Sequence, residues 1–320
     1  MLLILTNSDD ATADYLTEAF RCSGVEFQRF DTDRTLANAC FRYRVGSPEL
    51  RIDGKWFRPN EITNIWYRRP EHLKHPAIPE TPEGNFIIDE WGESLEAFLA
   101  HVPAASWMNH PANNVNASHK LEQLTTASRL GFEVPRTLVT QDQAELLEFY
   151  DQVNGKVIIK PLSGGYVARP GDVPDSHIYT NRVEKCQLEK LDDLAYCPTF
   201  FQEEIQKDID VRITIVDDDI HAIELRAAEA DGSQRCDIRR NNMADVIYRS
   251  GNLPPAIEKR IRALMNHYGL RFAAIDMAVK QSGDWVFFEV NPNGQWAWLD
   301  LAGVSQIATS FVHSFTKVRV

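Results

Sequence analysis

Two acidic side chains near the C-terminal end of this 320-residue chain, Asp276 and Glu289, are the residues best placed to do chemistry. They belong to two apolar segments, 272–279 and 285–290, which flank the sequence Gln-Ser-Gly-Asp, typical of a tight turn between antiparallel strands. A turn centred on the Ser-Gly pair places Asp276 directly opposite Glu289. The two carboxylates are therefore expected to face each other across a hairpin.

Asn291 falls on the same face as Glu289, because side chains alternate along a strand. Two opposed carboxylates repel each other unless a cation lies between them. With an amide oxygen beside them, they suit magnesium, which usually keeps waters and phosphate oxygens as further ligands. Asp276, Glu289 and Asn291 are the predicted metal ligands. The alternative, two acids on a solvated sheet face, stays open, but the apolar neighbours of both residues disfavour it.

A candidate phosphate-binding element lies in the middle of the chain. Lys160 ends the apolar segment 157–160, and Ser163-Gly164-Gly165 follows, where glycines let backbone N–H groups approach a phosphate. The sequence is not that of a P-loop, which would read GxxxxGK[ST]. A solvated lysine at a strand end is the open alternative, and Lys120, near the start of a predicted helix, is a weaker candidate of the same kind.

Arginines are concentrated in the last third of the chain. Guanidinium groups bind phosphates and carboxylates through two hydrogen bonds, so this density beside a metal hairpin suits phosphoryl chemistry. Ion-paired surface arginines in an acidic protein are the alternative, which explains Arg235 and Arg249 better than Arg212 and Arg239. The six arginines are Arg212, Arg226, Arg235, Arg239, Arg240 and Arg249.

The composition excludes several classes of protein. The chain is 43% hydrophobic and 25% charged, as in an ordinary globular protein, and no apolar run approaches the ~20 residues of a membrane span. A net charge of -12, from 34 basic and 46 acidic residues, argues against nonspecific binding to nucleic acid or to a membrane. The five scattered cysteines form no CxxC pair, so we expect reduced thiols and a cytoplasmic location.

The elements that must position these residues fall into three blocks. The first begins strand–helix–strand, which favours a parallel sheet covered by helices, and adds antiparallel strands around Asp53-Gly54. The second contains a capping box from Thr140 to Gln143 that starts a helix, and a segment, 166–177, without periodicity that we expect to be a mobile loop. The third is rich in strands. The predicted strands are 2–5, 25–30, 41–45, 50–57, 62–67, 134–139, 157–160, 200–205, 210–216, 221–227, 272–279 and 285–290, and the helices are 10–22, 86–102, 118–130, 257–268 and 304–315.

The order and spacing of these motifs resemble those of the ATP-grasp ligases over nearly the whole chain. Within that superfamily the chain looks most similar to the maturases of ribosomal peptides called graspetide (microviridin-type) synthetases, which are related to the ribosomal-protein glutamate ligases. The superfamily motifs are Lys120, Lys160-Pro-Leu-x-Gly-Gly, Gln202-Glu203-Glu204-Ile205, Asp210-Val211-Arg212, Asp237-x-Arg239-x-Asn241, Asp276 and Glu289-x-Asn291. The features that indicate the maturases are Phe30-Asp31-Thr32-Asp33, Trp66-Tyr67-Arg68-Arg69-Pro70 and Asn291-Pro-Asn-Gly-Gln-Trp-Ala-Trp298.

The resemblance implies an α+β fold, with an N-terminal pre-ATP-grasp α/β domain (1–110), a small lid subdomain (111–199) and a C-terminal metal- and substrate-binding subdomain (200–320). It implies ATP and Mg²⁺ as cofactors and Arg212, Arg239 and Asn241 as catalytic residues. It also implies that Arg68, Arg69, Arg226 and Arg240 contact the substrate. The implied ATP-binding residues are Lys120, Lys160, Ser163, Gly164, Gly165, Glu203, Glu204 and Ile205.

The implied reaction is ATP-dependent activation of Asp or Glu side-chain carboxyls of a precursor peptide as acyl phosphates. Attack by Ser, Thr or Lys side chains would then give ester or amide macrocycles. The expected partner is a peptide with a leader and an acidic, Ser/Thr-rich core, and a homodimer is compatible with the family. Two alternatives stay open: a ligase that adds a free amino acid to a protein or small molecule, and a nucleotide-binding scaffold without turnover.

Overall fold

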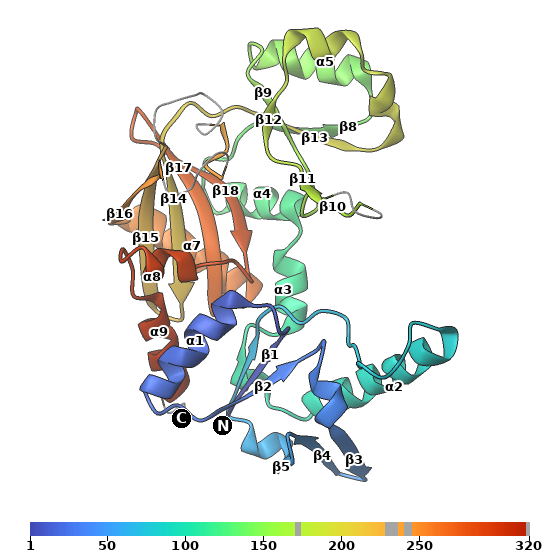
Figure 1. Cartoon of the computed structure of the whole chain (residues 1–320). Coiled ribbons are helices and arrows are strands. Elements are labelled where there is room, and N and C mark those ends of the chain that lie inside the picture. The colour runs from blue at the N-terminus through green and yellow to red at the C-terminus, as the bar shows by residue number, and fades with distance from the viewer. Residues whose placement is uncertain (170–173, 228–235, 240–244, 318–320) are drawn as a thin grey trace.

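The computed structural model describes residues 1–169, 174–227, 236–239 and 245–317. Figure 1 shows three parts: an N-terminal sheet with its helices, a C-terminal sheet beside it, and an upper lobe that stands apart from both. No helix among the described residues is long and apolar enough to cross a membrane. Short 3-10 turns connect the main elements: η1 (Thr35–Asn38), η2 (Pro59–Glu61), η3 (Ala104–Ser106), η4 (Lys185–Glu189) and η5 (Asp192–Tyr196).

The N-terminal sheet is parallel, with the strand order β2-β1-β6-β7, as the strand–helix–strand start of the chain predicts. The side chains of its central strand alternate between two hydrophobic cores, Leu2 and Ile4 on one side and Leu3 and Leu5 on the other. The first helix begins at Asp10, whose carboxylate accepts from the backbone N–H groups of the next turn. These elements are β1 (Leu2–Thr6), α1 (Ala11–Cys22), β2 (Phe27–Asp31), β6 (Asn64–Tyr67), α2 (Pro82–Leu99) and β7 (Trp107–Met108).

A three-stranded antiparallel sheet, formed by β3 (Cys40–Arg44), β4 (Ser47–Ile52) and β5 (Lys55–Phe57), packs onto the N-terminal part. The predicted turn at Asp53-Gly54 joins its last two strands. Both turn residues have positive φ, 48° and 85°, as a two-residue hairpin turn requires.

The upper lobe is a four-stranded antiparallel sheet with the order β12-β9-β13-β8, and α5 covers it. The capping box predicted from Thr140 to Gln143 is wrong in its details. The N-cap residue is Asp142, which accepts from the backbone N–H groups of Ala144 and Glu145, while Thr140 ends the preceding strand. The elements are β8 (Thr137–Thr140), α5 (Gln143–Gln152), β9 (Val157–Lys160), β12 (Asn181–Arg182) and β13 (Thr199–Glu203).

The segment predicted as a mobile loop contains a short hairpin that projects below the upper lobe in Figure 1. Its strands are β10 (Tyr166–Val167) and β11 (Ser176–His177), which pair antiparallel, with the rings of Tyr166 and His177 5.4 Å apart. Two residues per strand are too few to leave a periodic pattern in the sequence, which is why the hairpin was not predicted. Residues 170–173 lie outside the described part of the chain.

The C-terminal sheet is antiparallel, with the order β16-β15-β14-β17-β18. Helices α3, α4 and α7 share one hydrophobic core with it, and Phe200 of the upper lobe belongs to the same core. Its strands are β14 (Lys207–Val216), β15 (Asp219–Arg226), β16 (Ile247–Gly251), β17 (Phe272–Lys280) and β18 (Trp285–Asn291). The helices are α3 (Pro111–Ala117), α4 (Lys120–Arg129), α7 (Pro255–Tyr268), α8 (Ala297–Leu301) and α9 (Ile307–Thr316).

The two ends of the chain meet in a second core. Leu2 and Ile4 of β1 and Phe20 of α1 pack in one cluster with Phe311 and Phe315 of α9. The aromatic rings of Phe20 and Phe315 lie 5.8 Å apart, edge to face. The N-terminal and C-terminal sheets are therefore joined by a shared apolar interior.

Asn109 joins the same two sheets by hydrogen bonds. Its side chain is 2% exposed, and its amide donates to the carbonyls of Phe272 and Pro292 at 2.7 and 3.0 Å. Its carbonyl oxygen accepts from the N–H groups of Arg271 and Phe272 at 2.8 and 3.0 Å. The backbone of Asn109 has a φ of 58°, in the left-handed region that asparagine tolerates better than most residues.

Replacing Asn109 by alanine is expected to lower the free energy of unfolding by about 3 kcal/mol, because four backbone groups, three of them in buried hydrogen bonds, lose this partner. Asn154→Ala is the matched control, since Asn154 has a similar φ of 54° but an exposed side chain. Urea denaturation of both variants measures the difference. Equal losses would mean that the left-handed backbone, and not the hydrogen bonds, makes Asn109 important.

Candidate active site

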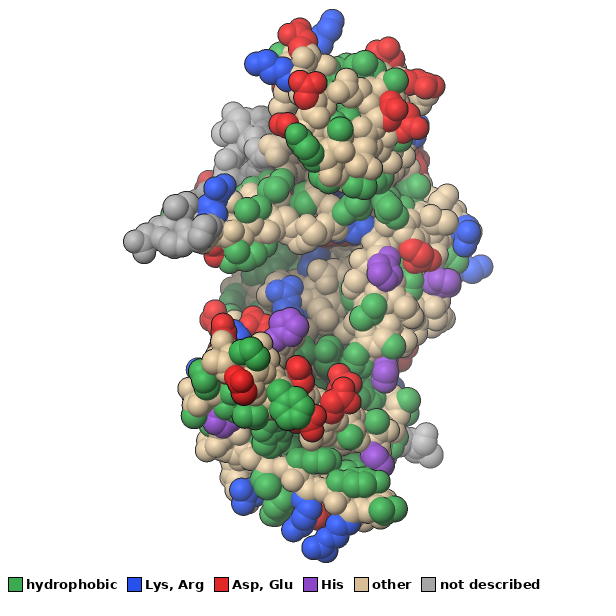
Figure 2. All heavy atoms as spheres, turned by 90° about the vertical axis from the view of Figure 1, so that its right-hand side faces the viewer, with side chains coloured by type: hydrophobic (Ala, Val, Ile, Leu, Met, Phe, Trp, Pro, Cys, Tyr) green, Lys and Arg blue, Asp and Glu red, His purple; other side chains and the backbone are tan. Residues whose placement is uncertain are grey.

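A cavity of about 1220 Å³ lies between the upper lobe and the C-terminal sheet, where Figure 2 shows the surface hollowed. Most residues that the sequence nominated for function line this one cavity, although they come from both ends of the chain. They are Arg69, Lys120, Lys160, Ser163, Gly164, Glu203, Glu204, Ile205, Arg212, Arg239, Asp276, Glu289 and Asn291.

Asp276 and Glu289 are direct cross-strand partners on β17 and β18, as predicted. Nearer the turn, however, Met277 pairs with Phe287, so the register is offset by one from the prediction there. Phe288 is the extra residue of a β-bulge that restores the predicted pairing at Asp276. The bulge therefore keeps both carboxylates on the cavity side of the hairpin.

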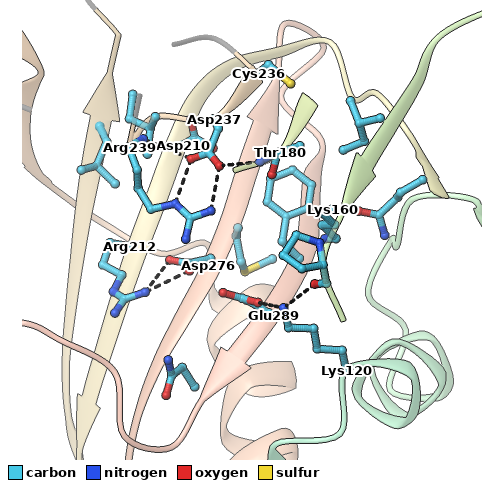
Figure 3. Close-up of a pocket in the computed structure, with 18 of the residues that line it drawn as sticks. Lys120, Lys160, Thr180, Asp210, Arg212, Cys236, Asp237, Arg239, Asp276 and Glu289 are labelled. Carbon is cyan, nitrogen blue, oxygen red and sulfur yellow. Dashed lines mark hydrogen bonds and ion pairs between the residues drawn. The ribbon is translucent and has the colours of Figure 1, made fainter. Parts of the chain in front are cut away.

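Arg212 holds the carboxylate of Asp276 in a fixed orientation (Figure 3). The two residues face each other on β14 and β17, and Arg212 Nη1 donates to both carboxylate oxygens at 2.8 and 2.9 Å. Arg212 Nη2 donates to the main-chain carbonyl of Gln295 at 2.8 Å. With 13% of its side chain exposed, the guanidinium has little freedom to turn.

Two lysines approach Glu289 from the opposite wall. Lys120 Nζ lies 3.9 Å from a carboxylate oxygen of Glu289 and donates to the carbonyl of Pro161 at 3.1 Å. Lys160 Nζ lies 4.9 Å from the centre of the Phe200 ring. The pKa of Lys160 is lowered to about 8, chiefly by burial; Glu289 opposes this shift, while the charges of Lys120 and Arg239 add to it.

A second ion pair, between the exposed side chain of Arg239 and the buried carboxylate of Asp237, lies near the upper lobe. Arg239 donates to both oxygens of Asp237 at 2.9 and 2.7 Å, and Asp237 also accepts from the N–H of Thr180 at 3.2 Å. Burial would raise the pKa of Asp237, but the hydrogen bonds and charge of Arg239 lower it to about 2. Arg239 is therefore a fixed cation on the cavity wall, and it is fixed by Asp237, a motif residue to which the sequence gave no role.

The segment from Glu203 to Ile205 crosses from the upper lobe to the C-terminal sheet along one side of the cavity. The N–H groups of Glu203 and Glu204 already donate to the carbonyls of Arg136 and Lys156, at 2.9 and 2.8 Å. Among the described residues nothing accepts from the N–H of Ile205. This segment therefore offers one backbone donor, at Ile205, for a ligand edge.

Asp210 and Lys207 form a further pair in the cavity wall; the sequence placed Asp210 in a motif but gave neither residue a role. Lys207 Nζ donates to Asp210 at 2.6 Å, and both side chains are largely buried. Burial raises the pKa of Asp210, and the charge of Lys207 opposes this shift. The sequence does place Asp210 on the same strand face as Arg212. Alternation along a strand cannot, however, tell whether that face lines a cavity or the surface.

Several nominated residues lie elsewhere. Arg226 is not in the cavity lining and pairs with Asp208 at 3.3 Å. Gly165 has a φ of 72°, and a side chain there would meet the carbonyl of Ile178 at 2.7 Å, so this glycine is required by packing at the base of the hairpin. Two further nominees, Arg240 and Asn241, lie outside the described residues.

Arg68 corrects the sequence analysis, which assigned it to a substrate surface. Its side chain is fully buried. It donates to the side-chain oxygen of Gln295 at 2.7 Å, and its Nε lies 3.6 Å from Asp10. Its neighbour Arg69 lines the cavity, and its contact with the substrate stays a prediction. Two adjacent arginines of one motif therefore serve different purposes, because the chain leaves β6 between two packed domains.

The donors at the hairpin fit a hard cation. Asp276, Glu289 and Asn291 offer only oxygen atoms, which suits magnesium, whereas zinc prefers thiolate and imidazole ligands. Throughout the part of the chain that the structure describes, no three His, Cys, Asp or Glu side chains gather in a metal-binding cluster. A magnesium ion here would therefore need ligands from outside the protein, such as phosphate oxygens and water.

Comparison with known proteins identifies the fold. No protein-family profile and no curated protein matches the sequence. Among solved structures, the chain is similar to the macrocyclase MdnC of Microcystis aeruginosa MRC bound with its precursor peptide MdnA, with a TM-score of 0.84, 26% identity and 99% of each chain covered. It is also similar to a RiPP-associated ATP-grasp ligase of Chryseobacterium gregarium in complex with ADP and a leader and core peptide, with a TM-score of 0.83, 28% identity, and 98% and 96% of the chains covered.

A third likeness is more remote. D-alanyl-alanine synthetase A of Vibrio cholerae O1 shares the fold at a TM-score of 0.57 and 14% identity, with 98% of this chain and 97% of that chain covered. The α+β ATP-grasp fold predicted from the sequence is thus confirmed, and so is the resemblance to the macrocyclases. The chain has the architecture of the ATP-grasp ligases over its full length.

The unusual pKa of Lys160 can be tested without any assumption about a ligand. Competitive acetylation followed by mass spectrometry of the peptide around Lys160 should give a midpoint near pH 8, as the value of about 8 requires, well below the ~10.4 of an ordinary lysine. Lys120→Met should move that midpoint up, because it removes a neighbouring positive charge. Glu289→Gln should move it down. A midpoint that neither substitution shifts would contradict the proposed electrostatic coupling.

Proposed function

We propose that this chain is an ADP-forming ATP-grasp ligase that closes macrocycles in a ribosomally made precursor peptide. The substrate carboxyl belongs to an Asp or Glu side chain, and the acceptor is a Ser or Thr hydroxyl or a Lys amine of the same peptide. The observation that carries the proposal is one cavity that gathers two lysines, two fixed arginines and two opposed carboxylates. The full-length likeness to peptide macrocyclases supports the choice of substrate.

ATP is proposed to lie between the upper lobe and the C-terminal sheet. Lys120 and Lys160 would hold its phosphates, together with Ser163, Gly164 and Gly165, while the N–H of Ile205 would meet the adenine edge beside Glu203 and Glu204. Because Lys160 is half-buried and has no hydrogen-bonded acceptor among the described residues, an anion there would relieve the cost of removing its charge from water.

Asp276, Glu289 and Asn291 are proposed to hold magnesium, which when bound neutralises phosphate charge and positions the phosphate oxygens. Arg212 and Arg239 would place two further charges beside the phosphoryl group that is transferred. Each guanidinium is already oriented by a carboxylate, so no reorganisation is needed during the reaction. The catalytic assignment of Asn241, outside the described residues, also stays a proposal.

The reaction balances without a covalent enzyme intermediate. A carboxylate oxygen of the peptide attacks the γ-phosphorus of ATP, the bond to ADP breaks, and an acyl phosphate forms. The acceptor hydroxyl or amine then attacks the acyl carbon, loses its proton, and inorganic phosphate leaves. Each bond formed therefore removes one water from the peptide. The protein supplies positioning and charge stabilisation, which are the main sources of acceleration in such reactions.

The proposed substrate is a peptide with a leader and an acidic, Ser/Thr-rich core. Arg69 at the cavity wall offers a cation to a core carboxylate, and Arg226 and Arg240 are proposed as contacts further from the chemistry. Three parts, 1–110, 111–199 and 200–320, are proposed to contribute the pre-grasp, lid and metal-binding functions. A homodimer is a further proposal that the same family suggests.

Mass spectrometry tests the function. Incubated with ATP, magnesium and a synthetic acidic, Ser/Thr-rich peptide that carries a leader, the protein should remove one water mass per bond, whereas added residue masses would indicate a free-amino-acid ligase. Glu289→Gln should lower ADP release by more than about a hundredfold, the scale at which a charge-stabilising group acts, while the protein stays folded. Asp284→Asn, in the turn of the same hairpin, is the control and should react normally. Near-normal turnover by Glu289→Gln would sink the metal assignment.

Substitutions of Arg239 and Arg226 should have different effects, because only Arg239 lines the cavity. Arg239→Ala should abolish both ATP hydrolysis and peptide modification, because a cation fixed on the cavity wall is lost. Arg226→Ala should weaken peptide binding but leave the slow, peptide-independent hydrolysis of ATP, since Arg226 does not line the cavity. Peptide titrations of ADP release distinguish the two effects. Parallel loss of both activities in both variants would show that the division between chemistry and recognition is wrong.

A further inference from the structure

Arg68 of the N-terminal domain holds the loop that follows β18. Its Nη2 donates to Gln295 Oε1 at 2.7 Å, and its Nη1 donates to the main-chain carbonyl of Asn293. The Nε atom lies 3.6 Å from a carboxylate oxygen of Asp10, and the side chain is fully buried. The pKa of Arg68 is lowered to about 10, chiefly by burial, so the group remains a cation at neutral pH.

The same loop holds Arg212. The main-chain carbonyl of Gln295 accepts from Arg212 Nη2 at 2.8 Å, and Arg212 Nη1 binds both oxygens of Asp276. One residue, Gln295, therefore contacts Arg68 through its side chain and Arg212 through its backbone. The contacts run without a gap from the N-terminal domain to the carboxylate proposed to bind magnesium.

The packing around this loop leaves no room for a side chain at residue 294. A side chain at Gly294 would place its Cβ 2.3 Å from the Cβ of Ala274 and 2.8 Å from Arg212 Nη2. Arg212 therefore lies directly against the loop backbone, which only glycine permits. A displacement of the loop must move the guanidinium with it.

The first turn of α1 secures the other side of Gln295. Thr12 Oγ1 donates to Gln295 Oε1, the atom that also accepts from Arg68. Asp10 caps the same helix and faces Arg68. The start of α1 and the end of β6 thus converge on one glutamine side chain that lies at the cavity wall.

We propose that Arg68 and Gln295 are positioning residues, which orient Arg212 toward the reacting phosphoryl group from the N-terminal domain. This inference rests on the proposed function, which assigns Arg212 and Asp276 to phosphoryl transfer. If Arg68 no longer holds the side chain of Gln295, Arg212 keeps its hydrogen bonds to Asp276, but its guanidinium can rotate about them. Its charge then no longer lies where negative charge develops, which matters because preorganised charge is what accelerates the reaction.

Arg68→Met and Gln295→Met test the inference, with Arg271→Met as a matched control. Arg271 also ties the two domains, through Asp217 at 2.7 and 2.9 Å and the carbonyl of Trp107 at 3.1 Å, but it does not line the cavity. Arg68→Met should lower kcat for ADP release about thirtyfold with KM for ATP within about twofold, the pattern of an interaction made only in the transition state. Arg271→Met should lower the melting temperature similarly and leave kcat unchanged.

A double variant shows whether the two residues act through each other. Arg68→Met with Gln295→Met should lose no more kcat than the worse single variant, because both remove one contact. Gln295→Glu, which keeps the acceptor oxygen, should retain most of the activity. Multiplied losses in the double variant, or a normal kcat in Gln295→Met, would overturn the inference.

Calorimetry separates failure of this inference from failure of the proposed function. The gain in ADP affinity on adding magnesium should shrink about fivefold in Arg68→Met, as expected for a charge moved by a small distance near the cation, and should be unchanged in Arg271→Met. This measurement needs no peptide, so it stands even if the substrate is different. An unchanged magnesium effect in Arg68→Met, in a wild-type protein that does bind ADP, would refute the positioning role.

Discussion

The repulsion between two carboxylates on neighbouring strands determines where the positive charges of this site must lie. Asp276 and Glu289 are cross-strand partners, and such a pair is unfavourable unless positive charge compensates it. Arg212 reaches Asp276 from β14, and Lys120 approaches Glu289 from α4. A chain with a net charge of -12 thus gathers cations at one place. The acidic pair explains why they gather there, and the space between them suits a metal ion with phosphates.

The cations of the cavity are of two kinds, and the difference has functional meaning. Arg212 and Arg239 are each clamped by a carboxylate through two hydrogen bonds, so their directions are set before any ligand arrives. Lys160 is half-buried near the ring of Phe200, and its partial removal from water lowers its pKa to about 8. Fixed charges suit the stabilisation of a transition state, whereas a destabilised charge gains most from binding an anion.

Local sequence patterns predicted most helices and strands, but they did not predict the features that depend on contacts between residues far apart in the sequence. The hairpin that carries Asp276 and Glu289 was predicted from the alternation of side chains and from its turn. The predicted pairing of these two residues is correct only because the bulge at Phe288 compensates a one-residue offset nearer the turn. The burial of Arg68 could not be predicted, because Asn293, to which it donates, lies 225 residues away in sequence. The β10–β11 hairpin has strands too short for any periodic signal.

The shared core of the chain's two ends bears on how this protein is made. Leu2 and Ile4 are synthesised long before Phe311 and Phe315, yet the four side chains share one cluster. Until α9 is synthesised, the apolar face of β1 that packs with it therefore stays open to solvent. Chaperone binding during translation would protect that face. A nascent chain that stalls before α9 is complete would expose an aggregation-prone surface.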